Sequence, residues 1–428
     1  MPGDKAQLLS AQALRTESSP INYLMALAFE RPDAISLAAG FVDNESLPVT
    51  EMLACCREML SDPAAARAAL QYGTTQGHRP LRERLIRRLV DREGPAGEGM
   101  ALDADHVVLT SGSQQMLFLI CSVLLDPDDI VLLPRPAYFV FMDTLRVFGA
   151  RTLGIDMDAE GLRADHLDRR LTELDRAGEL GRVKFLYVCS YCDSPTGLTL
   201  SASRRRELME VVARWRRRQQ FYVLEDAAYR DLVYDAQTVI PSLKSLDRGN
   251  ASVIYLETFS KPLAPGLKTG YGILPTSLVA PVLDQKGSHD FGSANLCQHL
   301  ICRLLDSGRA DEHLRQLHAA YRPKRDALLG ALDREMSGLA GVSWTRPLGG
   351  LYVWLTLPTR INTDLDGPLF KRCLDKGVLY VPGSACYQGE PGFDAPRNHI
   401  RLSFGVPTPD ENREGVRRLA QALREEMA

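Results

Sequence analysis

The chain has 428 residues, of which 45% are hydrophobic and 25% charged, and its net charge is −3. The length exceeds one typical core and indicates two domains, and the composition is that of a globular protein. The small net charge gives no support to a nucleic-acid partner. The longest apolar run, residues 116–125, is too short to cross a bilayer, so no membrane partner is expected.

The cysteines and the N-terminus bear on localisation. Nine cysteines, an odd number spread over a long chain, indicate a reducing compartment. Cys189 and Cys192 form a C-x-x-C, but a zinc site needs a second ligand pair at a suitable spacing, and the sequence shows none, so we expect no metal. The N-terminal MPGDKAQLLSAQ lacks the apolar core of a signal peptide. We therefore expect a soluble, cytoplasmic protein.

Residues 100 to 275 alternate between strand and helix patterns. Helical patterns stand at 114–126 and 203–219, and continuous apolar runs predict strands at 106–110, 129–134, 183–190, 221–226 and 252–257. Buried strands joined by helices are typical of a mostly parallel sheet covered on both faces. The sequence therefore predicts an α/β fold.

After about residue 295 the pattern changes. A helical region at 295–338 precedes strand-like runs at 349–358, 378–383 and 399–404, and a helix ends the chain. This pattern indicates a smaller α+β domain. We expect a large domain at 49–295, a small domain at 296–428, and an N-terminal segment, 1–48, that packs on the small domain.

Candidate functional residues follow the predicted strands, where parallel α/β sheets bind their ligands. Ser113 and Gln114 lie in "SGSQQ" between a strand and a helix, where free helix N–H groups suit a phosphate, although an ordinary N-cap is the commoner meaning of such a turn. Asp226 ends a strand in "EDAAY", and Tyr229 follows one helical turn later. Tyr138 follows another strand and could be a core residue or stack on a flat ligand.

Two lysines, Lys261 and Lys268, follow the strand at 252–257 in "LETFSKPLAPGLKTGYG". They could be solvated turn charges, or a nucleophile and an anion-binding group. A phosphate cradle, an aromatic platform, an acid, a phenol and a lysine together form the set that pyridoxal phosphate needs.

Several motifs recur in a specific order: "LQYGTTQGHRPLRERL", "SGSQQ", "PAY", "SPTG", "EDAAY", "TFSK", "PLGGLYVW", "VLYVPGSACY" and "NHIRLSF". With this ordered set the chain resembles the fold-type I, class I/II aminotransferases, and within them the kynurenine/α-aminoadipate and multiple-substrate subgroup. The resemblance implies a pyridoxal 5'-phosphate enzyme and a homodimer. It also implies ping-pong transfer of an amino group from an α-amino acid to a 2-oxo acid.

The resemblance also implies roles for matching positions. Lys261 forms the Schiff base and moves the proton, Asp226 pairs with the pyridine nitrogen, and Tyr229 hydrogen-bonds the phenolic oxygen O3′. Substrate binding falls to Arg401, which takes the α-carboxylate, and to Gly40. The other implied cofactor contacts are Tyr138 on the ring, Ser194 near O3′, Ser113, Gln114, Ser260 and Lys268 on the phosphate, and Tyr72 on the partner subunit's phosphate.

Three stretches depart from the family pattern. Ser194 stands where the family has an asparagine that bonds O3′, and Lys268 stands where it has an arginine. The stretch "GFVDNESLP" lacks the usual proline and carries Asp43 and Glu45 near the place where the substrate side chain is often read.

These departures leave two alternatives to transamination. One is another pyridoxal-phosphate reaction of an amino acid: β- or γ-elimination or replacement, decarboxylation or oxidation. The other is a binding or regulatory protein without catalysis, against which the retention of Lys261, Asp226, Tyr229 and Arg401 argues.

Overall fold

The computed structural model describes residues 8–16, 23–24, 26–27, 30–38, 40–234, 240–387, 389–390 and 392–427. Residues 1–7, which begin the stretch used to exclude a signal peptide, lie outside the described residues. Within the described ranges, no helix is both long and apolar enough to cross a membrane. The nine cysteines are free thiols.

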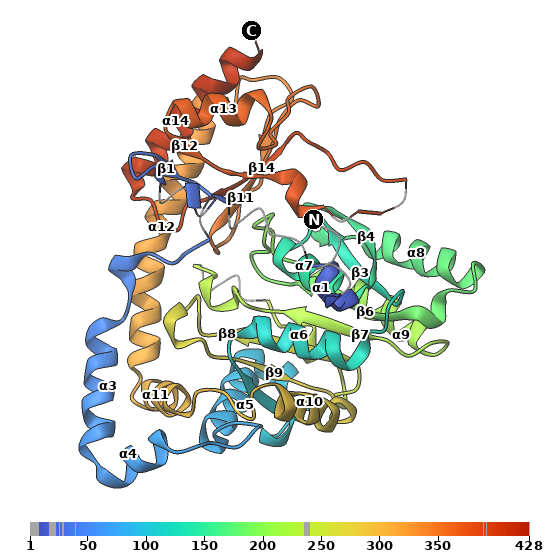
Figure 1. Cartoon of the computed structure of the whole chain (residues 1–428), viewed down its shortest axis with the longest axis vertical. Helices are drawn as coiled ribbons and strands as arrows, with labels where there is room; N and C mark the ends of the chain where they lie inside the picture. Colours follow the sequence, from blue (N-terminus) through green and yellow to red (C-terminus); the bar gives the residue numbers. More distant parts are fainter. Residues whose placement is uncertain are drawn as a thin grey trace.

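An eight-stranded sheet forms the centre of the molecule (Figure 1). Its strand order is β2-β9-β8-β7-β6-β3-β4-β5. The four pairs from β8 to β4 are parallel, whereas β9 runs antiparallel to both of its neighbours and β5 antiparallel to β4. The prediction of a mostly parallel sheet is confirmed. The strands are β2 (Val107–Thr110), β3 (Ile130–Arg135), β4 (Arg151–Asp158), β5 (Gly161–Leu162), β6 (Val183–Cys189), β7 (Tyr222–Asp226), β8 (Val253–Thr258) and β9 (Gly270–Ile273).

Strands β4, β5 and β9 were not among those that the sequence predicted. Strand β9 contains Gly270 and Gly272, which interrupt its apolar pattern. Because glycine usually weakens a strand, the pattern did not indicate one here. Close packing explains them: a Cβ on Gly270 would lie 2.6 Å from the Ser113 nitrogen, and one on Gly272 would lie 2.8 Å from the Met116 side chain. Helix α6 (Ser113–Leu124) therefore sits directly on this end of the sheet.

Helices cover both faces of the sheet. Alternate residues of β3 enter different cores: Val131 and Leu133 join the core that includes α6, whereas Ile130 and Leu132 join the core of α8 and α9. The remaining helices of this region are α3 (Val49–Ser61), α4 (Pro63–Leu70), α5 (Arg79–Glu93), α7 (Phe139–Phe148), α8 (Ala164–Arg176), α9 (Ala202–Arg216) and α10 (Thr276–His289).

The C-terminal part builds a second sheet, of order β10-β11-β14-β13, with antiparallel pairs. The helical region predicted at 295–338 is two helices, α11 (Asn295–Asp306) and α12 (Arg309–Met336), because Gly308 takes a left-handed φ of 73° between them. The other elements are β10 (Ser343–Trp344), β11 (Tyr352–Thr356), α13 (Pro368–Asp375), β12 (Val378–Leu379), β13 (Val381–Pro382), β14 (His399–Ser403) and α14 (Pro409–Met427).

The N-terminal segment contacts both parts of the molecule. Strand β1 (Ile35–Ser36) pairs in parallel with β12, and the Leu37 carbonyl accepts a hydrogen bond from the Ser403 nitrogen. Helix α1 (Ala11–Leu14) lies instead beside α7, where the Arg15 guanidinium donates to the Val147 carbonyl at 3.1 Å (Figure 1). The chain before α3 thus reaches from the second sheet to the central one.

Candidate active site

The carboxyl ends of β7 and β8 bring together the three residues that were predicted to be catalytic. Asp226 is the last residue of β7, and Lys261 follows β8 by three residues. The Lys261 Nζ lies 5.9 Å from the centre of the Tyr229 ring and donates to the Gly40 carbonyl at 2.9 Å. The N-terminal segment therefore closes over the lysine.

Asp226 is buried and held by two donors. The Ala228 backbone N–H donates to one carboxylate oxygen at 3.0 Å, and the Tyr187 hydroxyl donates to the other at 3.0 Å. Burial holds the pKa of Asp226 above its ordinary value, although both hydrogen bonds act in the opposite direction. Tyr187, on the neighbouring strand β6, was not predicted; its signal is a tyrosine two residues before the end of an apolar strand.

Tyr229 meets a second tyrosine from the other sheet. Its hydroxyl lies 3.2 Å from that of Tyr352, the first residue of β11, and the two rings stand nearly perpendicular. The Tyr352 hydroxyl lies 2.5 Å from the position that a Cβ on Gly40 would take. Residue 40 is therefore glycine because the phenol occupies the space of any side chain.

Arg401 is 2% exposed and only partly hydrogen-bonded. Its Nη2 donates to the Ala38 carbonyl at 3.0 Å, and its guanidinium stacks 4.3 Å from the centre of the Tyr352 ring. Among the described residues, its Nε has no hydrogen-bond partner. A buried guanidinium with an unused donor is suited to receive a carboxylate.

Tyr138 caps α7 directly after β3. Burial, with Tyr352 and Asp226 close by, raises the pKa of its phenol above the ordinary value. The neutral ring thus lies among the groups described above, at the edge of the same site.

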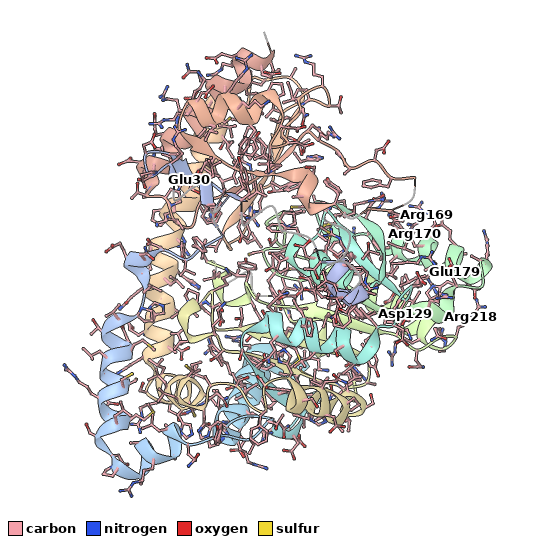
Figure 2. All side chains as sticks on the ribbon, viewed as in Figure 1. Glu30, Asp129, Arg169, Arg170, Glu179 and Arg218 are labelled. Atoms are coloured by element: carbon pink, nitrogen blue, oxygen red, sulfur yellow. The ribbon has the colours of Figure 1, made fainter. Side chains whose placement is uncertain are left out.

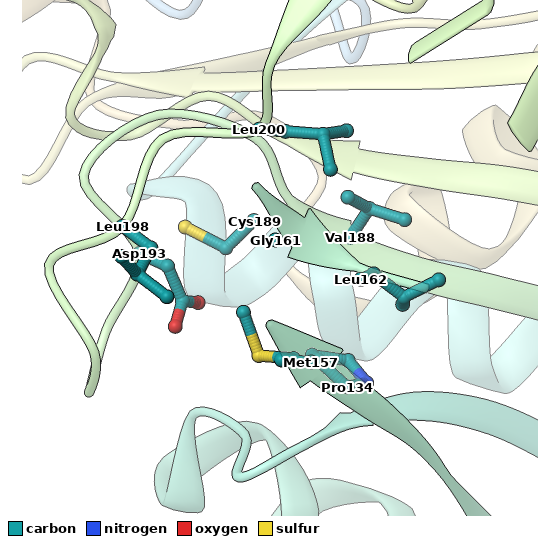
Figure 3. Close-up of a pocket in the computed structure, with 9 residues that line it drawn as sticks. All are labelled: Pro134, Met157, Gly161, Leu162, Val188, Cys189, Asp193, Leu198 and Leu200. Atoms are coloured by element: carbon teal, nitrogen blue, oxygen red, sulfur yellow. The ribbon is translucent and has the colours of Figure 1, made fainter. Parts of the chain in front are cut away.

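Ser194 and Asp193 lie in the loop after β6. The Ser194 Oγ and the Asp193 Oδ1 are buried and lack a hydrogen-bond partner within the part of the chain that the structure describes. The other Asp193 oxygen accepts from the Thr196 hydroxyl at 2.7 Å, and burial raises the pKa of Asp193 to about 7. Asp193 and Cys189 face a cavity of about 10 Å³ (Figure 3), room for about one water molecule and too small for an amino acid.

Two of the residues predicted to hold the phosphate, Ser113 and Gln114, begin α6. The first-turn N–H groups of Ser113 and Gln114 have no acceptor within the helix. The Gln114 side chain instead donates to the Thr144 hydroxyl at 2.9 Å. The backbone N–H of Gln114 is therefore the group of this residue that can bind an anion. The Ser260 hydroxyl accepts from Thr258 at 3.0 Å, and Lys268 is exposed, with a left-handed φ of 44°.

Tyr72 lies apart from these residues. It is 85% exposed, and its ring packs edge-to-face on that of Phe291 with 6.1 Å between centres.

Asp43, which the sequence places near the region where the family reads the substrate side chain, already has partners within the protein. Its carboxylate pairs with the Lys324 ammonium at 3.1 Å and accepts from the Ser46 hydroxyl at 2.7 Å. Lys324 also donates to the Gly405 carbonyl at 3.0 Å. The Asp43 charge is therefore already matched by a cation from α12.

The donor set of this site fits pyridoxal phosphate. Asp226 supplies an acid, Lys261 an amine, and the α6 terminus free N–H groups for a phosphate. The buried Ser194 Oγ and Arg401 Nε still need partners, which a bound cofactor and its substrate can supply.

Comparison with known proteins decides the family. The model for aminotransferase class I and II matches residues 32–419. The chain belongs to this family. It is a pyridoxal-phosphate-dependent aminotransferase of fold type I, and amino-group transfer is favoured over the other reactions of that cofactor.

Relatives support this aminotransferase assignment along nearly the whole chain. Aromatic-amino-acid aminotransferase 1 of Thermococcus litoralis is 34% identical over 424 residues, which cover 99% of this chain and 96% of that protein. The 2-aminoadipate transaminase of Thermus thermophilus is 34% identical over 413 residues, 96% of this chain and 95% of that protein. The structure of a Pyrococcus horikoshii kynurenine aminotransferase in complex with PMP is 34% identical, with a TM-score of 0.89 and coverage of 100% of this chain and 99% of that one.

Proposed function

We propose that this aminotransferase uses Lys261 as its catalytic amine and Arg401 as its carboxylate receptor. One observation carries the proposal: Lys261 and Arg401 donate to the carbonyls of Gly40 and Ala38, so an amine and a buried guanidinium with an unused donor face the same short segment. An α-amino acid presents a carboxylate and a reacting α-carbon one bond apart. Arg401 can bind the carboxylate while Lys261 acts on the α-carbon.

The other site residues hold cofactor and substrate. When bound, pyridoxal phosphate supplies an aldehyde that takes up an amine and a ring that withdraws electrons from the substrate α-carbon. Asp226 keeps a proton at the pyridine nitrogen, and Tyr229 donates to the phenolic oxygen. Tyr138 packs on the ring, and Lys261 takes the proton from the α-carbon and returns it to the cofactor side.

Anion binding falls to the groups around α6. Backbone N–H groups of Ser113 and Gln114, the Ser260 hydroxyl and the Lys268 ammonium surround the place where a phosphate sits at a helix N-terminus. The hydroxyl of Ser194, which has no partner among the described residues, would hydrogen-bond O3′.

The preferred amino donor has an uncharged side chain. Besides Lys261, Lys324 is a cation in contact with the 40–48 segment, and its charge is paired with Asp43, so Lys324 offers no free charge to a second carboxylate. The relatives named for aromatic amino acids and kynurenine support the same choice. The Asp43→Asn variant tests this preference, because it leaves the Lys324 charge without its carboxylate partner. It should raise kcat/KM for 2-aminoadipate or aspartate and leave kcat/KM for aromatic donors within about twofold.

The active unit is a homodimer in which Tyr72 reaches the phosphate of the other copy. Its ring is largely exposed in the single chain, as are Phe291 and Leu70 nearby, so this face has apolar surface for a partner to cover. A fully active monomer by light scattering at assay concentration, or unchanged cofactor affinity in Tyr72→Phe, would contradict this.

The deciding experiment mixes holoenzyme with single amino acids and no acceptor. We expect conversion of the cofactor to its stable pyridoxamine form, fastest with aromatic donors. Release of ammonia, carbon dioxide or peroxide would overturn transamination. A best rate with 2-aminoadipate or aspartate would overturn only the donor preference.

A further inference from the structure

Tyr352 places a second phenol in the site. It comes from the smaller sheet and is buried, and its hydroxyl accepts a hydrogen bond of 3.2 Å from that of Tyr229, with the two ring planes 76° apart. Nothing in the transamination roles described above uses this hydroxyl. A buried polar group brought across 123 residues of chain to one hydrogen bond suggests a role for that bond.

The surroundings fix the hydroxyl in place. The Gly40 backbone leaves no room for a Cβ beside it, and the Arg401 guanidinium stacks on its ring. Burial opposes ionisation of this phenol, but the charges of Arg401 and Lys261, together with the hydrogen bond from Tyr229, outweigh burial and lower the pKa of Tyr352 below its ordinary value. A more acidic phenol is a stronger hydrogen-bond donor.

The two phenols carry one proton each, which limits how they can pair. In this structure the Tyr229 hydroxyl donates to that of Tyr352. If Tyr229 instead directs its proton to the cofactor's phenolic oxygen, this hydrogen bond reverses, because Tyr229 can then only accept from Tyr352. The hydroxyls then form a chain in which Tyr352 donates to Tyr229 and Tyr229 donates to the cofactor. Donation into an oxygen strengthens that group as a donor in its turn, because hydrogen bonds in a chain polarise one another.

We propose that Tyr352 is a positioning residue of the transamination site that acts through Tyr229, strengthening the hydrogen bond from Tyr229 to the phenolic oxygen of the cofactor. This inference rests on the contact proposed above for Tyr229. It gives the site a further source of stabilisation for that oxygen, beside the one that the short hydroxyl of Ser194 would supply.

The test is a double-mutant cycle on the holoenzyme, with Tyr352→Phe, Tyr229→Phe and the double variant. The readouts are the pH midpoint of the visible cofactor absorbance and the cofactor Kd. We expect Tyr352→Phe to raise the midpoint by about 0.5 to 1 unit and to weaken cofactor binding about two- to fivefold, since the oxygen loses stabilisation of its charged form. In the Tyr229→Phe background the same change should have almost no effect.

Each outcome decides something different. An unshifted midpoint in Tyr352→Phe, or an equal shift in both backgrounds, overturns the inference. An unshifted midpoint in Tyr229→Phe refutes the proposed Tyr229 contact itself. The phenylalanine keeps the ring under Arg401, so the donor KM should stay within about twofold, and a large rise in KM would point to a structural effect instead. If Tyr352→Phe folds poorly, Gly40→Ala, which displaces the hydroxyl, should raise the midpoint in the same direction, and an unshifted midpoint there overturns the inference.

Discussion

The Lys261 Nζ donates a hydrogen bond of 2.9 Å to the carbonyl of Gly40, which lies 221 residues earlier in the chain. This bond ties the strand-end lysine of the central sheet to the N-terminal segment that also runs beside Arg401. The catalytic amine, the segment above it and the carboxylate receptor are therefore held as one unit, and changes to any of them should be felt at the others.

Lys261→Ala should abolish the visible absorbance of the lysine-bound cofactor, because Lys261 is the amine that lies 5.9 Å from the centre of the Tyr229 ring. Lys268→Ala is the matched control. It should weaken cofactor binding, since an exposed phosphate contact is lost, and leave the band formable at high cofactor. Absorbance titrations of both apoproteins check this, and the reverse pattern would show that Lys268 is the amine.

Gly40→Ala should lower kcat/KM by about tenfold or more, because the new Cβ would stand 2.5 Å from the Tyr352 hydroxyl. The next nearest ring atom is 3.5 Å away, an ordinary contact. Adding Tyr352→Phe should therefore recover part of the loss, as measured by steady-state kinetics of the two variants. A double variant no better than Gly40→Ala would mean that the clash lies with the backbone of the segment.

Asp193→Asn should change how stability depends on pH. Burial raises the pKa of this carboxyl to about 7, above the unfolded value near 3.8, so the folded state binds the proton more tightly. The contribution of this carboxyl to the free energy of unfolding is fully present below about pH 4. It is lost as the pH rises toward 7, at about 1.4 kcal/mol per unit of pKa difference. The variant should gain stability relative to the parent over that window.

Thermal unfolding midpoints at pH 5 to 8 measure this difference for Asp193→Asn. Asp410→Asn is the control, because the Asp410 side chain is 94% exposed and should give a difference that does not vary with pH. Parallel pH profiles of parent and Asp193→Asn would contradict the shifted pKa.

Glu390→Gln should loosen a contact between the two parts of the molecule. Arg170, which Figure 2 labels on α8, pairs with Glu390. Glu390 also accepts from the Gly154 nitrogen at 3.0 Å and lies 3.5 Å from Arg135. The variant removes the negative charge that pairs with the mostly buried Arg135 and Arg170, which should lower the free energy of unfolding by about 1–3 kcal/mol.

The control for Glu390 is Glu179→Gln, which removes a partly exposed ion pair with Arg151. Glu179, labelled in Figure 2, lies in the turn that follows α8. Exposed pairs contribute less than about 1 kcal/mol. Urea unfolding of both holoenzyme variants compares them. Equal losses would show that Glu390 is no more important than a surface charge.

The sequence by itself determined five of the eight strands of the central sheet, all except β4, β5 and β9, and which residues follow those strands. Apolar runs such as 183–190 and 252–257 are local patterns, and so are the turns that place Asp226 and Lys261 after them. The ordered motifs also gave the family. Strand β9 was not predicted, because its glycines are required by close packing against α6, and a local sequence pattern does not show that contact.

The tertiary structure alone decided how the side chains are used. The Gln114 side chain turns to Thr144 and leaves its backbone N–H for an anion, and Asp43 is matched by Lys324 rather than free to read a substrate. Tyr229 meets Tyr352 across 123 residues. Hydrogen-bond partners this far apart in the chain follow from how the two sheets and the N-terminal segment pack together. Neither residue type nor spacing along the chain determines which of these distant residues meet.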